Sequence, residues 1–177
     1  MDELQGKINY HGIIAIVLAV VLQIVLAPAM TIGAAMPNFI AVYVLCATLS
    51  NASSRPMILA FVLGLIFDLL GSGPVGAMAF CLVLITTLAS AVYRNMSNDS
   101  WMTAMIIIVV SCLLIELLYG IIMLLVGAGD GFGSALIHRI LPCTLYDIVI
   151  AAFMHPIVSR LVAPRGSTKT DSIPMIG

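Results

Sequence analysis

The chain has 177 residues, of which 62% are hydrophobic and 8% are charged, and its mean hydropathy is +1.20. A soluble domain has roughly 45–50% apolar and about 25% charged residues, so this composition excludes a soluble core and indicates a membrane protein. The formal net charge is −1, and no run of basic residues is present to bind phosphates. We therefore expect no nucleic-acid partner.

Long apolar runs separated by short polar breaks define the predicted elements. A bilayer core about 30 Å thick needs about 20 apolar residues per spanning helix. We therefore predict an all-α polytopic membrane protein with six transmembrane helices in a single domain, residues 1–162. A polar, acidic segment precedes the first run, so we expect this run to be a retained span and not a cleaved signal. The predicted helices cover about residues 12–30, 38–49, 56–70, 75–92, 101–126 and 135–162.

The second and third runs are short. At 1.5 Å per residue they reach only about 18–22 Å, less than the full bilayer. We expect the other helices to shield both of them from lipid. The sixth run carries Pro142 and Pro156. Each removes a backbone donor and crowds the preceding turn, so we expect irregular helix near both.

The distribution of basic residues predicts the orientation. With six spans, one side of the membrane holds six basic residues and the other holds only Arg139. Basic residues concentrate on the cytoplasmic side, so both termini are predicted to be cytoplasmic. Residues 163–177 are polar and are expected to form a disordered cytoplasmic tail. The six residues are Lys7, Arg55, Arg94, Arg160, Arg165 and Lys169.

Three acids lie inside the apolar runs: Asp68, Glu116 and Asp147. An ionisable group costs at least about 2.5–3.5 kcal/mol in the centre of a membrane helix, so each is expected to face the bundle interior with a partner. One reading is a transport or proton-relay role. The other, which we favour, is structural: the acids are protonated or hydrogen-bonded and hold helices together. Under this reading, Asp68 is not a proton carrier.

Asp68 also belongs to a face of small residues in the third predicted helix. Ala60, Gly64 and Asp68 recur at four-residue spacing, and Gly71 follows on the same side. Such a face allows another helix to approach closely. The segment from Gly71 to Gly76 is short and apolar, which predicts a tight connection between antiparallel neighbours.

The sequence predicts neither a metal site nor an enzyme. Its four cysteines lie in separate apolar runs without ligand spacing, so we read them as small buried hydrophobic residues and expect no cofactor. Ser90, Ser97 and Ser111 have no histidine at a suggestive helical spacing, which disfavours nucleophilic catalysis. The cysteines are Cys46, Cys81, Cys112 and Cys143.

An ordered set of motifs resembles the MreD family of bacterial rod shape-determining membrane proteins. The set consists of Pro37-Asn38 at the start of the second helix, then Gly64-x-x-x-Asp68, then the small-residue turn Gly71–Gly76. Further along, Pro142 with Asp147, and Pro156, stand where the family tends to have a proline and a polar residue. The similarity extends over nearly the whole chain.

The resemblance implies a non-enzymatic component of the cell-elongation machinery in the bacterial plasma membrane. Such a protein binds the membrane helix of the scaffold protein MreC. It is found with the actin-like MreB filament and with the RodA–penicillin-binding protein synthase, which builds lateral-wall peptidoglycan.

A second reading follows from the same resemblance. The family is similar in fold to the substrate-binding subunits of energy-coupling-factor vitamin transporters, which are six-helix proteins of similar size. The alternative is therefore a small-molecule-binding transporter subunit, with Ala15 and Ala19 as its helix-docking face. Composition does not separate the two readings. A vitamin-binding subunit needs a pocket with converging polar and aromatic side chains.

Overall fold

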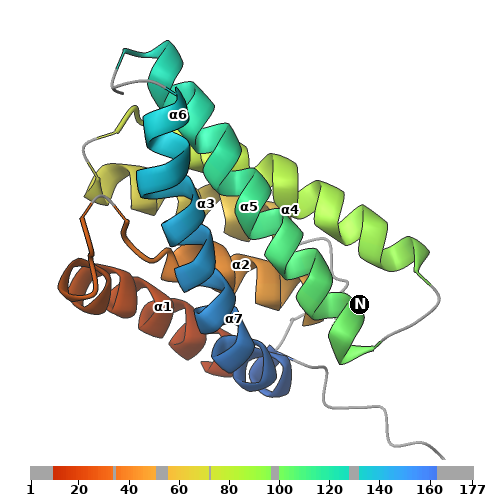
Figure 1. The fold of residues 1–177 in the computed structure, drawn as a ribbon. Coiled ribbons are helices and arrows are strands. Elements are labelled where there is room, and N and C mark those ends of the chain that lie inside the picture. The colour runs from red at the N-terminus through yellow and green to blue at the C-terminus, as the bar shows by residue number, and fades with distance from the viewer. Residues whose placement is uncertain are drawn as a thin grey trace, which may run out of the picture.

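The computed structural model describes residues 10–33, 35–50, 56–71, 73–96, 100–127 and 132–162. Within these ranges all regular secondary structure is helical, and extended pairing is limited to one bridge between Ile32 and Ala35. The predicted all-α class is confirmed. The elements are α1 (Tyr10–Ala29), α2 (Phe39–Ser50), α3 (Pro56–Leu70), α4 (Ala77–Asn95), α5 (Trp101–Leu125), α6 (Phe132–Ala135), the π-helix η1 (Leu136–Ile140) and α7 (Leu141–Val162) (Figure 1).

The last predicted helix is not one regular α-helix. It divides into the short α6, the π-helical turn η1 and the long α7. Pro142 is the second residue of α7, so it lacks the N–H that would bond to the carbonyl of His138, and its ring crowds that carbonyl. The wider π-turn lies directly before this position, where irregular helix was expected. α7 then continues through Pro156 to Val162.

Four helical segments are long and apolar enough to cross a membrane. α2 and α3 are apolar but shorter, with 12 and 15 residues. The protein is therefore a membrane protein by the length and composition of four helices, and a count of six spans remains a prediction. The four segments are Gly12–Ala29, Ala77–Asn95, Trp101–Leu125 and Gly133–Leu161.

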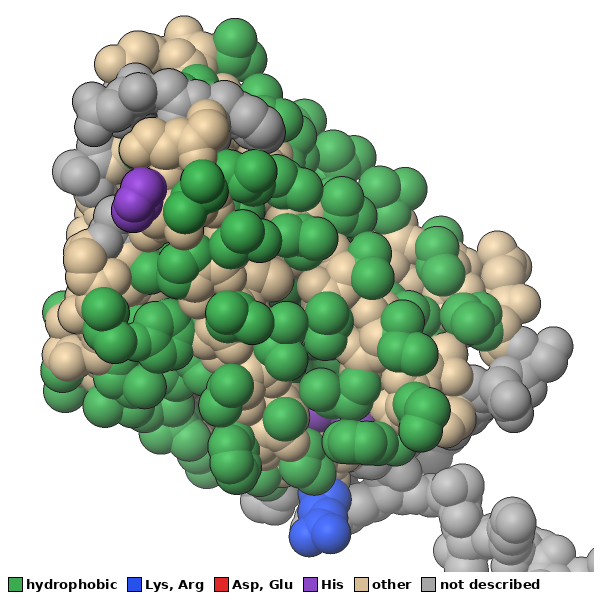
Figure 2. Space-filling view, viewed as in Figure 1, with side chains coloured by type: hydrophobic (Ala, Val, Ile, Leu, Met, Phe, Trp, Pro, Cys, Tyr) green, Lys and Arg blue, Asp and Glu red, His purple; other side chains and the backbone are tan. Residues whose placement is uncertain are grey.

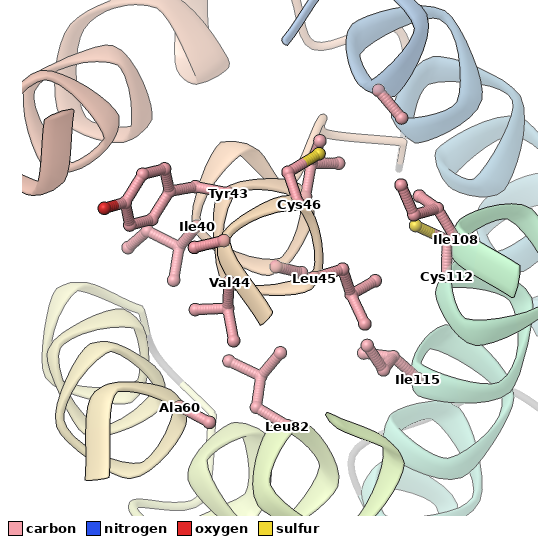
Figure 3. Packing of buried hydrophobic residues seen from close by; sticks show 14 of the residues in the cluster. Ile40, Tyr43, Val44, Leu45, Cys46, Ala60, Leu82, Ile108, Cys112 and Ile115 are labelled. Carbon is pink, nitrogen blue, oxygen red and sulfur yellow. The ribbon is translucent and has the colours of Figure 1, made fainter. Parts of the chain in front are cut away.

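The short helix α2 lies at the centre of the bundle. Every residue from Phe39 to Leu49 is buried, and α1, α3, α4, α5 and α7 all pack against it. Figure 3 shows Val44 and Leu45 pointing toward side chains of neighbouring helices, among them Leu82 and Ile115. The expectation that other helices shield this short helix is confirmed.

The same expectation is wrong for α3. Ala60 and Leu63 are buried, but on the opposite side of the helix Ile58 is 68% exposed and Phe61 is 52% exposed. α3 packs chiefly against α4 and presents its other face outward. Length alone does not separate a central helix from a peripheral one, because both are strongly apolar.

The outer surface of the bundle is largely apolar, as lipid contact requires. Figure 2 shows hydrophobic side chains over most of the visible face. Large apolar residues such as Val25, Leu145 and Phe153 are at least 65% exposed. Inside the bundle, by contrast, Asp68, Glu116 and Asp147 are buried, as expected for intramembrane acids.

Small apolar residues lie among the larger side chains in the interior of the bundle. Ala15 and Ala19, the helix-docking face of the transporter alternative, are buried in the hydrophobic core on the inner face of α1 and are therefore not accessible to a partner protein. All four cysteines are free and buried, as predicted for small hydrophobic residues. The predicted disordered tail, residues 163–177, lies outside the described residues.

Candidate functional site at two buried helix N-termini

The small face of α3 lies directly against α4. Ala60 is fully buried. A Cβ atom added to Gly64 would lie 2.5 Å from the Cα atom and 2.8 Å from the backbone nitrogen of Ala79. Only glycine at position 64 allows the two backbones this approach, because any side chain would overlap backbone atoms that cannot rotate away.

Asp68 lies at the end of this face and accepts hydrogen bonds from the N-terminus of α4. Its Oδ2 atom accepts from the backbone N–H groups of Gly76 at 2.9 Å, Met78 at 3.1 Å and Ala79 at 3.2 Å. Its Oδ1 atom accepts from Met78 at 3.0 Å. A helix N-terminus has N–H groups without an acceptor in the helix, and it carries a partial positive charge. A carboxylate accepts hydrogen bonds from these N–H groups, and its negative charge interacts favourably with the partial positive charge.

The connection between α3 and α4 makes this capping possible. Gly76, at the N-cap position of α4, has a φ of +97° and no side chain with which to cap the helix. The carboxylate of α3 therefore replaces the usual N-cap side chain. Gly71 donates its N–H to the carbonyl of Phe67 at 3.1 Å and ends α3. The predicted tight turn thus ends α3 at Gly71 and begins α4 at Gly76.

A second capped N-terminus, that of α2, lies in the bundle interior. The Oδ1 atom of Asn38 accepts from the N–H of Ala41 at 2.9 Å, the usual N-cap bond. The N–H of Asn38 itself donates to Oδ1 of Asp147 in α7 at 2.8 Å. Both residues are buried. Asp147 therefore holds the beginning of α2 across 109 residues of sequence.

Gln23 of α1 completes this second cap, and the sequence analysis did not identify it. Its Oε1 atom accepts from the N–H of Ile40 at 3.4 Å, and its Nε2 atom donates to the carbonyl of Pro37 at 3.3 Å. Gln23 is buried, 5% exposed. The sequence does contain a signal for this residue: Gln23 is an amide within a run of apolar residues. It follows Ala19 by four positions, which places both residues on the same helix face.

Glu116 of α5 lies beside this centre. It is buried and interacts with the side chain of Asn38 and with the charges of Asp147 and Arg139. The Arg139 guanidinium carbon lies 5.1 Å from the centre of the Tyr119 ring, one turn further along α5. The structure thus brings together two of the three intramembrane acids, while Asp68 serves the other N-terminus.

We call the first cluster the α4 cap (Asp68, Gly76, Met78 and Ala79) and the second the α2 cap (Gln23, Pro37, Asn38, Ile40 and Asp147, with Glu116 beside it). Each cap joins a helix N-terminus to a carboxylate from a different helix. Such bonds satisfy buried polar groups where water is absent and fix the relative positions of the helices. Among the described residues, no group of three or more His, Cys, Asp or Glu side chains is arranged to hold a metal ion.

A family model described as rod shape-determining protein MreD matches residues 7–164. The chain belongs to the MreD family. The match covers both caps and all the described helices. No curated protein and no solved structure matches the chain.

Membership in the MreD family gives the protein a role in rod shape and agrees with its four long apolar helices. MreD is a shape-determining family and is not known as an enzyme family. Several residues that carried the sequence resemblance lie in the two caps: Pro37, Asn38 and Asp147 in one, Asp68 and Gly76 in the other, with Gly64 one turn away from Asp68. Pro142 and Pro156 lie in α7, outside both caps.

Proposed function

We propose that this protein is a non-enzymatic component of the bacterial cell-elongation complex. It resides in the inner membrane, binds the scaffold protein MreC and helps to organise lateral peptidoglycan synthesis with MreB and the RodA–penicillin-binding protein synthase. The observation that carries the proposal is the match of the MreD family model over residues 7–164.

Several buried polar side chains form hydrogen bonds within the bundle itself, which supports a scaffolding role. Asp68, Asp147, Asn38 and Gln23 form hydrogen bonds within the protein. The outer faces of α1, α3 and α7 are apolar and exposed. In lipid, helices associate through close packing of such faces. A rigid bundle with apolar sides is therefore suited to bind the membrane helices of partner proteins.

Both termini are proposed to be cytoplasmic. Arg139 lies in η1, at the end of the bundle where α5 ends (Figure 1). Arg94 and Arg160 lie in the last turns of α4 and α7, and the antiparallel course of the chain puts these turns at the opposite end. Most basic residues mark the cytoplasmic side, which supports the proposed orientation.

The vitamin-binding alternative finds less support. Sites for drug-sized ligands are typically about 300–1,000 Å³ with converging polar groups. Two hollows have volumes of about 370 and 480 Å³, but both are lined almost entirely by apolar side chains. The hollow beside Gln23 measures only about 170 Å³, and the amide of Gln23 already bonds to Pro37 and Ile40. Family membership and the lack of converging polar groups in these hollows favour the elongation role.

Copurification tests the proposal. The full chain, tagged and expressed in a rod-shaped bacterium, is solubilised in mild detergent with MreC from the same cell. We expect MreC to elute with the tagged chain, and an unrelated single-span membrane protein to be absent. If MreC is retained no better than this control, the proposed binding is wrong.

A further inference from the structure

The surroundings of Arg139 hold its side chain in place. Arg139 lies in the π-helix η1, a geometry that is frequent at functional sites. Its side chain is half-buried, and its guanidinium lies over the Tyr119 ring at 5.1 Å. Arg160, in contrast, is exposed at the end of α7.

The aromatic partner of Arg139 is itself held rigidly. The rings of Tyr119 and Phe67 meet edge to face, with centroids 6.4 Å apart and an interplanar angle of 89°. The hydroxyl of Tyr119 packs against Gly73 in the turn before α4. Phe67 of α3 and Gly73 of the turn therefore fix the ring that positions the guanidinium.

The guanidinium retains capacity to bind an anion. Glu116 interacts with it electrostatically, and the Tyr119 side chain uses part of its hydrogen-bonding capacity. Among the described residues, however, no carboxylate oxygen approaches its nitrogens within the 4.0 Å of an ion pair. An arginine stacked on an aromatic ring keeps N–H donors in its plane, in a fork that matches two oxygens of a phosphate.

The surroundings of Arg139 are those of a lipid. Leu125 and Val126 at the end of α5, and Ile137 and Leu141 beside Arg139, are exposed apolar side chains. Tyr119 and Arg139 each lie six residues inside the end of a candidate span, about 9 Å along the helix. A long arginine side chain can extend from this depth to the level of the lipid headgroups. Basic side chains between membrane helices at headgroup level can bind anionic headgroups.

We infer that Arg139, positioned by Tyr119, binds the phosphate group of an anionic phospholipid, whose acyl chains lie along the adjacent apolar surface. The ligand chemistry is a phosphate oxyanion, and the apolar surroundings identify lipid as its source. This inference requires a membrane-embedded bundle and does not depend on MreC.

Native mass spectrometry of the full chain in detergent tests the inference. Phosphatidylglycerol and phosphatidylcholine are titrated separately, and the retained adducts are compared. We expect wild-type protein to retain phosphatidylglycerol more strongly. We expect Arg139→Gln to weaken this retention roughly tenfold, because the charge-assisted bonds to phosphate are lost. Arg139→Lys should retain an intermediate amount, since it keeps the charge without the fork.

Arg160→Gln is the matched control, since it removes a basic residue from the other end of α7. If Arg160→Gln weakens the retention of phosphatidylglycerol as much as Arg139→Gln does, retention depends on the net charge of the protein, and the proposed site at Arg139 is refuted. Unchanged retention in Arg139→Gln also refutes it. If that variant does not fold, equal retention of the two lipids by wild-type protein overturns the inference. Displacement of phosphatidylglycerol by an equal concentration of inorganic phosphate would refute lipid as the source.

Discussion

At the residue scale, the two oxygens of Asp68 serve three backbone N–H groups at the beginning of α4. Asp68→Asn keeps one acceptor oxygen, so we expect a loss of about 1 kcal/mol, the usual cost of a weakened cap. Asp68→Leu leaves these donors unpaired in the interior, at about 1–3 kcal/mol for each buried group. In thermal unfolding in detergent, the melting temperature should therefore be highest for the wild type, lower for Asp68→Asn and much lower for Asp68→Leu. Equal losses in both variants would show that the negative charge itself is indispensable.

Gln23 supports a prediction of the same kind in the α2 cap. Gln23→Met has a similar volume but can neither accept from Ile40 nor donate to Pro37. We expect it to lower stability by about 1–3 kcal/mol, the cost of unsatisfied buried groups. Val25→Met, on the exposed side of the same helix, is the control and should leave the melting temperature unchanged. If Gln23→Met and Val25→Met have the same melting temperature, the hydrogen bonds of Gln23 do not stabilise the N-terminus of α2.

At the element scale, the pairing of α3 with α4 depends on the absence of a side chain at position 64. Gly64→Ala adds one methyl group where the backbone of Ala79 already lies, and we expect it to destabilise the protein by about 1–3 kcal/mol through overpacking. Gly133→Ala adds the same group where no atom lies within 4 Å and should have little effect. Detergent melting curves of the two variants provide the comparison. Normal stability of Gly64→Ala would contradict the close contact.

Sequence patterns predicted some of these elements better than others. Asp68 and its small face could be predicted because both are local: a charge in an apolar run and a four-residue repeat. The partner of Asp147 could not, since it lies 109 residues away. Gln23 was missed because an uncharged amide is a weaker signal than a carboxylate. The exposure of α3 was missed because both its lipid-facing side and most of its protein-facing side are apolar.

At the scale of the whole molecule, the caps explain why a short helix can occupy the centre. α2 has 12 residues, and its N-terminus lies inside the bundle, where unpaired N–H groups are costly. Asn38, Gln23 and Asp147 come from three different helices and satisfy these groups together. The longer helices can then surround α2 and turn their apolar faces to lipid. The polar interior therefore stabilises the bundle, while its outside remains free for partners.

The orientation of the bundle can be tested with the protein's own cysteines left in place, because all four are buried and should react slowly. Ser134 in α6 and Ser100 before α5 are exposed at opposite ends. With both termini in the cytoplasm, Ser134→Cys should react in intact spheroplasts with a membrane-impermeant maleimide. Ser100→Cys should react only after the membrane is opened, since its end of the bundle carries Arg94 and Arg160. The reverse labelling pattern would show that the protein has the opposite orientation in the membrane. Arg139 and its proposed lipid would then lie in the cytoplasmic leaflet.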